Sequence, residues 1–366
     1  MKIRQYEIAK KLGLSPMTVS RVLRGHSNVS DGTRAQIIEM AQEMGAAHLF
    51  ATRHKNKDLP LRNLINCLLL IPTFENPQKF QEYYGNQALL KGLKSRLAPH
   101  QSEIVLKRFS RLEEIERMIE DARYQGLILR GHYPPQWTMK VAQRIPVVNT
   151  IASHGYLGVD SVGHHESLAC WTITEYLQQL GHQTIVWFGI IDTHTKNSIP
   201  TEMSLQSRLI ERYGHHGYRY ASWQEMSLFT DPHFHSKTIL VERDHEKQSL
   251  SEIIANGLEQ ILALKPKPTA IVAASDFMAF ELLHQLQEKE IKVPQQMSVI
   301  GYGNPVYSDH ADLGLTCIDL NYNEIGKMIP EILERRKANM NGSISQTLVE
   351  CPLVIGQTAC AVKNGS

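Results

Sequence analysis

Apolar positions near the amino terminus have the spacing of two short helices joined by a sharp turn. Val19, Val22 and Leu23 recur at i, i+3 and i+4, which places them on one face of a helix. This stripe is expected to pack on Ala9 and Leu12 of the preceding helix.

The second of these helices has two start signals and a polar face. Ser15 can accept a hydrogen bond from an unpaired amide of the first turn, and Pro16 has a φ angle already set for helix. The side chains that point away from the apolar stripe are Met17, Thr18, Ser20 and Arg21. Such a pair of helices is typical of a reader of the DNA major groove, although it also fits an ordinary helical hairpin on a protein surface.

A third helix is predicted directly afterwards, and three helices can close a small core. Its signals are Ser30 as N-cap, an apolar stripe of Ile37, Ala41 and Met44, and Gly45 as the stop. The chain then turns polar and reaches Pro60, which is the composition of a linker.

Beyond the linker, short β-branched apolar runs alternate with helical patterns. The predicted strands are Leu64–Ile71, Glu103–Leu106, Gly126–Leu129, Ile145–Val148, Thr184–Phe188, Thr238–Val241, Thr269–Ala273, Ser298–Tyr302 and Leu348–Ile355. This alternation predicts parallel sheets covered by helices on both faces. About 300 residues exceed the usual size of one such sheet, so we expect two doubly wound subdomains with a ligand cleft beyond the carboxyl ends of their strands.

Charge separates the amino-terminal segment from the rest of the chain. Residues 1–60 contain ten Lys or Arg and five Asp or Glu, a balance of +5, whereas the 366-residue chain carries +2 and its remainder therefore −3. A basic head on a mildly acidic body indicates that the head alone meets a polyanion, since neutralising phosphates releases counterions and favours binding.

The remaining composition excludes several classes of protein. No run approaches 18 apolar residues and no secretory signal is visible, so we expect a cytoplasmic protein without a membrane partner. Five widely spaced cysteines favour reduced, structural thiols over a disulfide framework or a zinc site. No phosphate-binding glycine loop, dinucleotide fingerprint or nucleophile elbow appears, so neither a cofactor nor an enzyme activity is predicted.

In several segments along its length, the chain resembles the LacI/GalR family of bacterial transcription regulators. The most specific match is the segment from Leu14 to Leu23, which is similar to the recognition-helix signature of the family. Further matching stations follow in family order: Asn76-Pro77, Leu180-Gly181-His182, Pro268 to Ile271 with Asp276, Val293-Pro294, Ser298 to Gly301, Leu315-Thr316 and Ile325-Gly326.

The resemblance implies an all-α helix-turn-helix DNA-binding head and an α/β, bilobed, periplasmic-binding-protein-like effector domain with two doubly wound parallel sheets. It implies a homodimer on a pseudo-palindromic operator and a small effector, commonly a sugar, in the cleft. The implied segments are a head (1–46), a linker (47–61), an effector domain (62–358) with a first lobe (62–161 and 292–321) and a second lobe (162–291 and 322–358), and a tail (359–366).

The resemblance also implies DNA-contacting residues. Those at base edges and nearby phosphates are Ser15, Pro16, Met17, Thr18 and Arg21, and those at the backbone are Arg4, Tyr6, Ser20, Arg24, Asn28, Ser30 and Thr33. Arg21 suits a bidentate guanine contact. In the linker Arg53 matches the family, but Lys55 replaces an apolar wedge and is expected to contact phosphate instead.

Candidate effector contacts come from the resemblance and from strand ends. Arg208 and Asp276 match stations where relatives hold ligand hydroxyls, and the strand-end candidates are Phe74, Glu75, Arg130, Asn149 and Asn304. Two alternatives stay open: Asp276 as the N-cap of a helix over 277–287, and Arg208 in a surface ion pair.

Two other functions compete with a ligand-responsive repressor of a carbohydrate operon. Seventeen histidines, including His164-His165, His215-His216 and the pair around Phe234, would fit a metal-dependent enzyme, although solvated loop histidines explain them equally. A solute-binding protein for transport would share the bilobed body, but it would need an export signal and no basic head.

Overall fold

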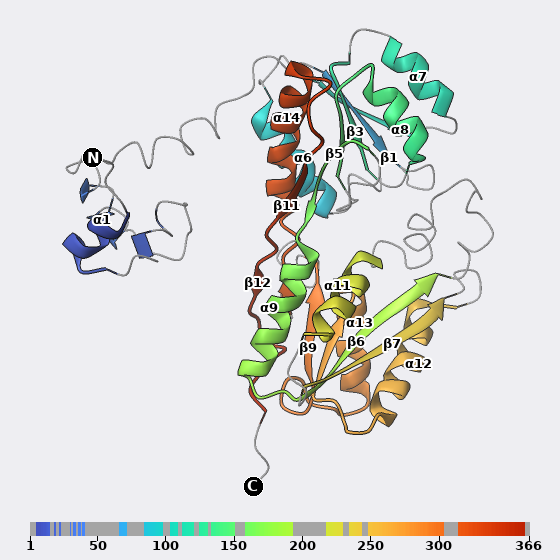
Figure 1. The fold of residues 1–366 in the computed structure, drawn as a ribbon. Coiled ribbons are helices and arrows are strands. Elements are labelled where there is room, and N and C mark those ends of the chain that lie inside the picture. The colour runs from blue at the N-terminus through green and yellow to red at the C-terminus, as the bar shows by residue number, and fades with distance from the viewer. Residues whose placement is uncertain are drawn as a thin grey trace. The chain divides into compact units, whose positions relative to one another are not determined.

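The chain forms two compact units, Met1–Leu61 and Arg62–Ser366 (Figure 1). The computed structural model describes residues 5–14, 18–19, 22, 30, 32–33, 36–37, 39–40, 66–71, 84–97, 103–108, 112–120, 124–130, 133–150, 158–192, 217–229, 234–243, 248–303 and 314–362.

The amino-terminal unit, called the head below, is helical around a small apolar core. Helix α1 (Gln5–Leu12) ends at Gly13, whose φ of +64° is left-handed. The amide of Leu14 then donates to the Ala9 carbonyl at 3.0 Å, which satisfies a free carbonyl of the last turn. The predicted packing is confirmed for the core, whose buried members are Ile8, Ala9, Val19, Val22 and Ile37.

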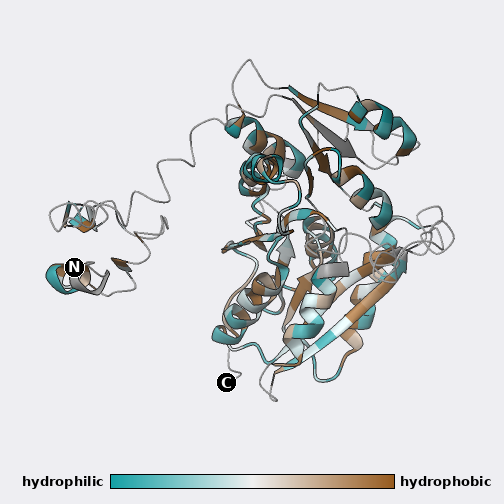
Figure 2. Ribbon diagram, turned by 45° about the horizontal axis from the view of Figure 1, so that its top comes forward, coloured by the Kyte–Doolittle hydropathy of each residue, from teal (hydrophilic) through white to brown (hydrophobic). Residues whose placement is uncertain are grey.

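The first lobe of the second unit is a six-stranded sheet with helices on both faces (Figures 1 and 2). Its strands are β1 (Asn66–Ile71), β2 (Glu103–Arg108), β3 (Gly126–Leu129), β4 (Val147–Asn149), β5 (Asp160–His164) and β11 (Gln346–Val349). Their order is β11-β5-β4-β3-β1-β2, and every pair is parallel.

Alternation along these strands divides the helices between the two faces. Ile128 packs in one cluster with helices α6 (Tyr84–Arg96) and α14 (Tyr322–Ala338). Its neighbours Leu127 and Leu129 pack in another cluster with α7 (Leu112–Glu120) and α8 (Pro135–Ala142). The strands are apolar on both sides because both faces are covered.

The second lobe repeats this architecture. Its strands are β6 (Thr184–Asp192), β7 (His235–Arg243), β8 (Ala270–Ala273), β9 (Ser298–Tyr302), β10 (Thr316–Ile318) and β12 (Leu353–Val354), in the order β12-β10-β9-β8-β6-β7. Only the β10–β12 pair among these is antiparallel. The helices are α9 (Glu166–Gln179), α11 (Gly217–Ser227), α12 (Leu250–Ala263) and α13 (Asp276–Glu288).

Three segments connect the lobes, and the predicted lobe boundaries near the carboxyl terminus are wrong. The chain passes from β5 to α9, back from β10 to α14, and again from β11 to β12. Residues 292–321, predicted in the first lobe, contain β9 and β10 of the second sheet, and residues 322–349, predicted in the second lobe, contain α14 and β11 of the first lobe.

Backbone packing explains this exchange. Ser298 of β9 pairs with Ala270 of β8, so β9 completes the second sheet. Helix α14 lies against α6 so closely that a Cβ on Gly326 would stand 2.1 Å from the Leu89 carbonyl oxygen, a contact that needs glycine. The sequence pattern contains neither constraint.

Further differences concern the last strands and the tail. The predicted strand Leu348–Ile355 is two strands, β11 and β12, in different sheets. Residues 359–362, predicted as a tail, are bound to the second lobe: the Val362 amide donates to the Leu180 carbonyl at 2.8 Å, and the Cys360 amide donates to Ser298 Oγ at 3.2 Å.

All five cysteines are free thiols, four of them buried. Among the described helices, none has both the length and the apolar composition needed to cross a bilayer.

Candidate functional site

In the head, the structure describes four of the predicted DNA-contacting residues. Tyr6 lies in α1, and Thr18 has helical backbone and is half-buried. Ser30 Oγ accepts a hydrogen bond from the Thr33 amide at 3.3 Å, as expected of an N-cap. The others lie outside the described residues: Arg4, Ser15, Pro16, Met17, Ser20, Arg21, Arg24, Asn28, Arg53 and Lys55.

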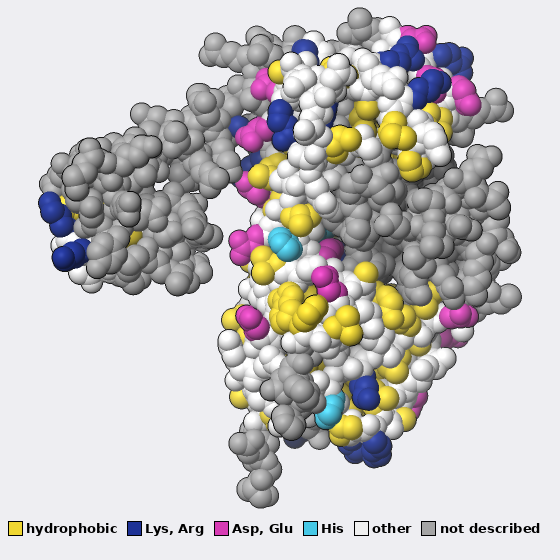
Figure 3. Space-filling model, in the orientation of Figure 1, with side chains coloured by type: hydrophobic (Ala, Val, Ile, Leu, Met, Phe, Trp, Pro, Cys, Tyr) yellow, Lys and Arg dark blue, Asp and Glu magenta, His cyan; other side chains and the backbone are white. Residues whose placement is uncertain are grey.

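Among the described residues of the head, the exposed charged side chains are two lysines and Glu39. Lys10 and Lys11 are exposed in the last turn of α1 (Figure 3). Cations at the carboxyl end of a helix also interact favourably with the helix dipole.

In the second unit, three predicted effector contacts stand at carboxyl ends of strands. Arg130 directly follows β3 and is 7% exposed, and the adjacent strand β4 ends at the buried Asn149, which pairs with Leu129. Asp276 opens α13 just after β8 and is 2% exposed. Phe74, Glu75, Arg208 and Asn304 lie outside the described residues.

Tyr322 brings side chains of the first lobe together where the chain crosses between lobes. The Arg130 guanidinium lies over the Tyr322 ring, 5.7 Å from its centroid. The His164 ring meets Tyr322 edge-on at 4.9 Å between centroids. A cation on one aromatic face and an edge contact both fix the ring orientation.

The second lobe contributes a buried arginine that sequence reasoning missed. Arg219 Nε donates to Glu166 Oε1 at 3.3 Å, and its NH1 donates to the Ala274 carbonyl at 2.8 Å. Its guanidinium also lies 4.9 Å from the centroid of the Tyr302 ring. The sequence offered one signal, a basic residue within an apolar helical face, but its partner Glu166 is 53 residues away.

Asp276 is not the N-cap of its helix, so that alternative is wrong. Ser275 is the N-cap, with its side chain accepting from the Met278 amide at 3.3 Å. The Asp276 carboxylate accepts from the Phe277 amide at 2.9 Å. It also fills the space beside Gly303, where a Cβ would stand 2.5 Å from its Oδ2 and where φ is +148°. Gly303 therefore allows the carboxylate to occupy this position.

Burial and charge set the protonation of this group of residues. Burial, with the guanidinium groups of Arg219 and Arg130, lowers the pKa of His164 to about 3, so its imidazole is neutral near pH 7. Burial raises the pKa of Glu166, and the Arg219 charge offsets part of that rise. Six residues stand at the carboxyl ends of the strands or near them, and we call this set the inter-lobe site: Arg130, Asn149, His164, Arg219, Asp276 and Tyr322.

The histidine pair in this region has a structural explanation. His165 is the N-cap of α9, with Nδ1 accepting from the Leu168 amide at 3.2 Å, while His164 packs on Tyr322. Within the described ranges no group of His, Cys, Asp and Glu has the arrangement of a metal site.

A helix-turn-helix head on a body of two doubly wound sheets, connected three times, defines a DNA-binding protein with a bilobed ligand-binding body. Residues 5–45 match the model of bacterial regulatory proteins of the lacI family. Residues 174–359 match the model of the periplasmic binding protein-like domain. The chain belongs to the LacI family of bacterial transcription regulators.

The similar proteins align with nearly the whole length of the chain. The ribose operon repressor of Haemophilus influenzae is 24% identical over 98% of both chains, and the CytR repressor of Escherichia coli is 24% identical over 95% of this chain and 94% of its own. Among solved structures, a lac repressor dimer bound to operator and an anti-inducer covers 99% of this chain with a TM-score of 0.57 and 18% identity. The cellobiose complex of the regulator CelR covers 97% with a TM-score of 0.55.

Replacing Arg219 should test the buried ion pair. We expect Arg219→Ala to lower the free energy of unfolding by about 3–5 kcal/mol, because it leaves Glu166 buried without its cation. Glu166→Gln added to Arg219→Ala should recover part of this loss. Urea unfolding measures each change, with Arg144→Ala, which breaks the exposed pair with Glu120, as a control that costs less than about 1 kcal/mol. Equal losses at the two arginines would contradict the assigned role.

The lowered pKa of His164 predicts a pH dependence of stability. The imidazole has a pKa of 6.5 when unperturbed and about 3 in the fold, so the unfolded chain takes up the proton first. Stability is therefore full above about pH 6.5 and falls as the pH drops toward 3. Urea unfolding at pH 7.5 and 5 should show a larger loss for the wild type than for His164→Gln. Identical losses in the two proteins would show that folding does not lower the pKa of His164.

Proposed function

We propose that this protein is a ligand-responsive transcriptional repressor that binds a pseudo-palindromic operator as a homodimer. The observation that carries the proposal is a basic helix-turn-helix head on the same chain as a bilobed body with a buried polar site between its lobes. A two-fold dimer presents two identical heads, and these require a two-fold related DNA site. The repressors named among the relatives support the same role, and a protein with this role is expected to act in the cytoplasm, where the DNA is.

In this proposal the second helix of the head reads bases, and its surroundings contact the backbone. Arg21 forms a bidentate contact with guanine, and Met17 contacts a thymine methyl. Lys55 contacts phosphate rather than acting as an apolar wedge.

The effector is a small polyhydroxylated molecule, most simply a sugar. The inter-lobe site supplies a buried carboxylate on Asp276, guanidinium groups on Arg130 and Arg219, and the ring of Tyr322. A carboxylate accepts a hydrogen bond from a sugar hydroxyl, and a guanidinium donates one to it. An aromatic face can pack against the sugar ring. The CelR–cellobiose complex among the similar structures supports this class of ligand.

Effector binding changes the closure of the lobes and so the operator affinity. The inter-lobe site takes Arg130 and His164 from the first lobe and Arg219 and Asp276 from the second, so a ligand that contacts both groups favours one relative position of the lobes. Coupling between two such sites has a free energy of roughly 1–3 kcal/mol. The operator titration shows whether the effector releases the protein from DNA or recruits it to DNA.

An operator titration tests the function. Duplexes selected from a random pool should bind the full-length protein in preference to random competitor, and ribose or cellobiose should shift the dissociation constant by roughly 5–150-fold. Asp276→Asn should abolish this shift, whereas His284→Ala, an exposed residue on the same helix α13, should preserve it. Absence of any preferred duplex would contradict the repressor proposal, and absence of any sugar response would contradict the effector class.

Replacing Arg21 tests the base contact. Arg21→Ala should cost about 1–3 kcal/mol on the selected duplex and relax the preference at one base pair. Lys11→Ala, an exposed cation of α1, should weaken selected and random duplexes by the same factor. If Arg21→Ala also weakens both equally, Arg21 contacts phosphate alone.

A further inference from the structure

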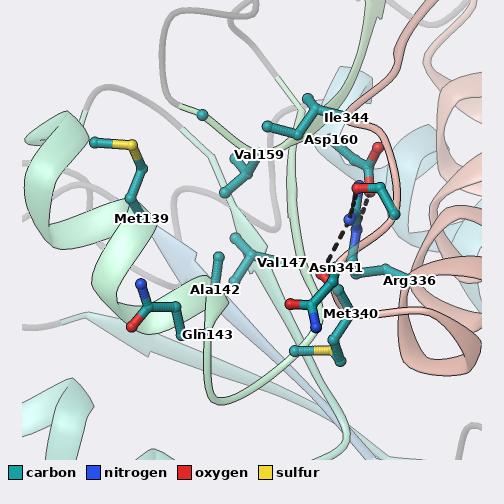
Figure 4. Close-up of a pocket in the computed structure, with 12 residues that line it drawn as sticks. Met139, Ala142, Gln143, Val147, Val159, Asp160, Arg336, Met340, Asn341 and Ile344 are labelled. Carbon is teal, nitrogen blue, oxygen red and sulfur yellow. Dashed lines mark hydrogen bonds and ion pairs between the residues drawn. The ribbon is translucent and has the colours of Figure 1, made fainter.

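The first lobe contains a cavity of about 210 Å³ at the amino ends of β4 and β5 (Figure 4). It lies between α8 on one side and, on the other, the end of α14 with the segment that leads to β11. Its apolar lining includes Met139, Ala142, Val147, Val159, Met340 and Ile344.

This cavity is separate from the inter-lobe site. Val147 and Asp160, which line it, are the first residues of β4 and β5, whereas Asn149 and His164 of the inter-lobe site are the last. A five-residue strand such as β5 separates its ends by about 13 Å. The two sites therefore lie at opposite edges of the same sheet.

One wall of the cavity is held in place by charge-assisted hydrogen bonds. Arg336 Nε donates to Asp160 Oδ2 at 2.7 Å, and its NH1 donates to the Gly342 carbonyl at 2.7 Å and to the Met340 carbonyl at 3.2 Å. Burial alone would raise the pKa of Asp160, but hydrogen bonds from Arg336 and Ser345 hold that pKa below its ordinary value. The charged groups thus support the wall and pair with one another.

The surface offered to a ligand is more apolar than polar. Val147, Val159 and Ala142 lie between two methionines, and Met139 and Met340 stand on opposite sides of this group (Figure 4).

The rim of the cavity keeps large apolar side chains in contact with solvent. Met139 is 46% exposed and Ile344 is 51% exposed. Gly158, with φ of +67°, leaves room for Met139, since a Cβ there would stand 2.6 Å from Met139 Cγ. A ligand in the cavity would remove this apolar surface from water.

We propose that this cavity is a second ligand site, which binds a small planar aromatic or heteroaromatic molecule. A cavity of about 150 Å³ holds one benzene ring, so 210 Å³ accommodates a bicyclic ring of the size of indole. Thioether groups make favourable contacts with aromatic rings, and Met139 and Met340 supply them from two sides. The exposed amides of Gln143 and Asn341 at the rim can bond polar atoms at the edge of the ring.

Indole is a suitable probe for full-length protein labelled with ¹³C at the methionine methyl groups. Ring currents should shift the methyl signals of Met139 and Met340, assigned through Met139→Leu and Met340→Leu, with saturation at millimolar or lower indole. Shifts confined to other methionines, or no saturable shift up to the solubility of indole, would overturn the proposal. Because the readout uses neither DNA nor sugar, it is independent of the repressor proposal.

Filling the cavity provides the matched test. Ala142→Phe should weaken indole binding at least tenfold, whereas Arg144→Ala, two residues further on and not part of the lining, should leave it unchanged. Circular dichroism checks that Ala142→Phe is folded, and if it is not, the wild-type titration decides by itself. Undiminished binding to folded Ala142→Phe would place indole elsewhere and overturn the proposal.

Discussion

The junction between the two lobes depends on the three chain crossings between their sheets. The crossings are bonded to one another: the His165 amide donates to the Val349 carbonyl at 2.8 Å, and the Asp319 amide donates to the Pro352 carbonyl at 2.8 Å. Asn321, with a left-handed φ of 50°, then turns the chain into α14 and places Tyr322 beside Arg130 and His164. Backbone hydrogen bonds between segments remote in sequence thus fix where the lobes meet.

Electrostatics at this junction is costly to maintain. Arg219 and Glu166 are both buried, and removing two charges from water costs several kcal/mol per ion, which their attraction only partly offsets. A core of apolar residues would serve stability equally well. The buried pair, the neutral His164 and the buried Asp276 lie near the carboxyl ends of the strands, where open α/β sheets bind ligands, and this position is the basis of the proposed effector site.

The two edges of the first sheet have different chemistry. At the carboxyl edge, the Arg130 guanidinium and the His164 imidazole both contact the Tyr322 ring, and the Arg219 charge of the other lobe lowers the pKa of His164. At the amino edge, Arg336 and Asp160 bond each other and nearby backbone, and the surface left to a ligand combines valine, alanine and methionine side chains with the amides of Gln143 and Asn341. One lobe can in this way offer a polar site and an apolar site without competition between them.

The sequence by itself determined the class of the fold and most of its strands. Apolar stripes with the period of a helix predicted that Ala9, Val19 and Val22 lie in the core of the head. Apolar runs predicted β3 and β9 with the bounds that the structure shows, because burial on both faces of a sheet leaves an unbroken apolar run. Strand-end position also selected Arg130 and Asn149, since parallel strands end together at one edge, whereas Asp276 was selected by the family resemblance.

Only the tertiary structure decided which lobe each late element joins and which distant side chains meet. β5 was not predicted because it contains few apolar residues, and β10 was not predicted because it has only three residues. Helix α14 joins the first lobe through close glycine contacts with α6, which no periodicity in the sequence encodes. Arg219 and Glu166 lie 53 residues apart, and His164 meets Tyr322 across the crossing. The pattern of apolar residues in a segment shows which of its faces is buried, but it does not show what covers that face. Contacts between residues remote in the sequence form only when the complete sheets and their helices pack together.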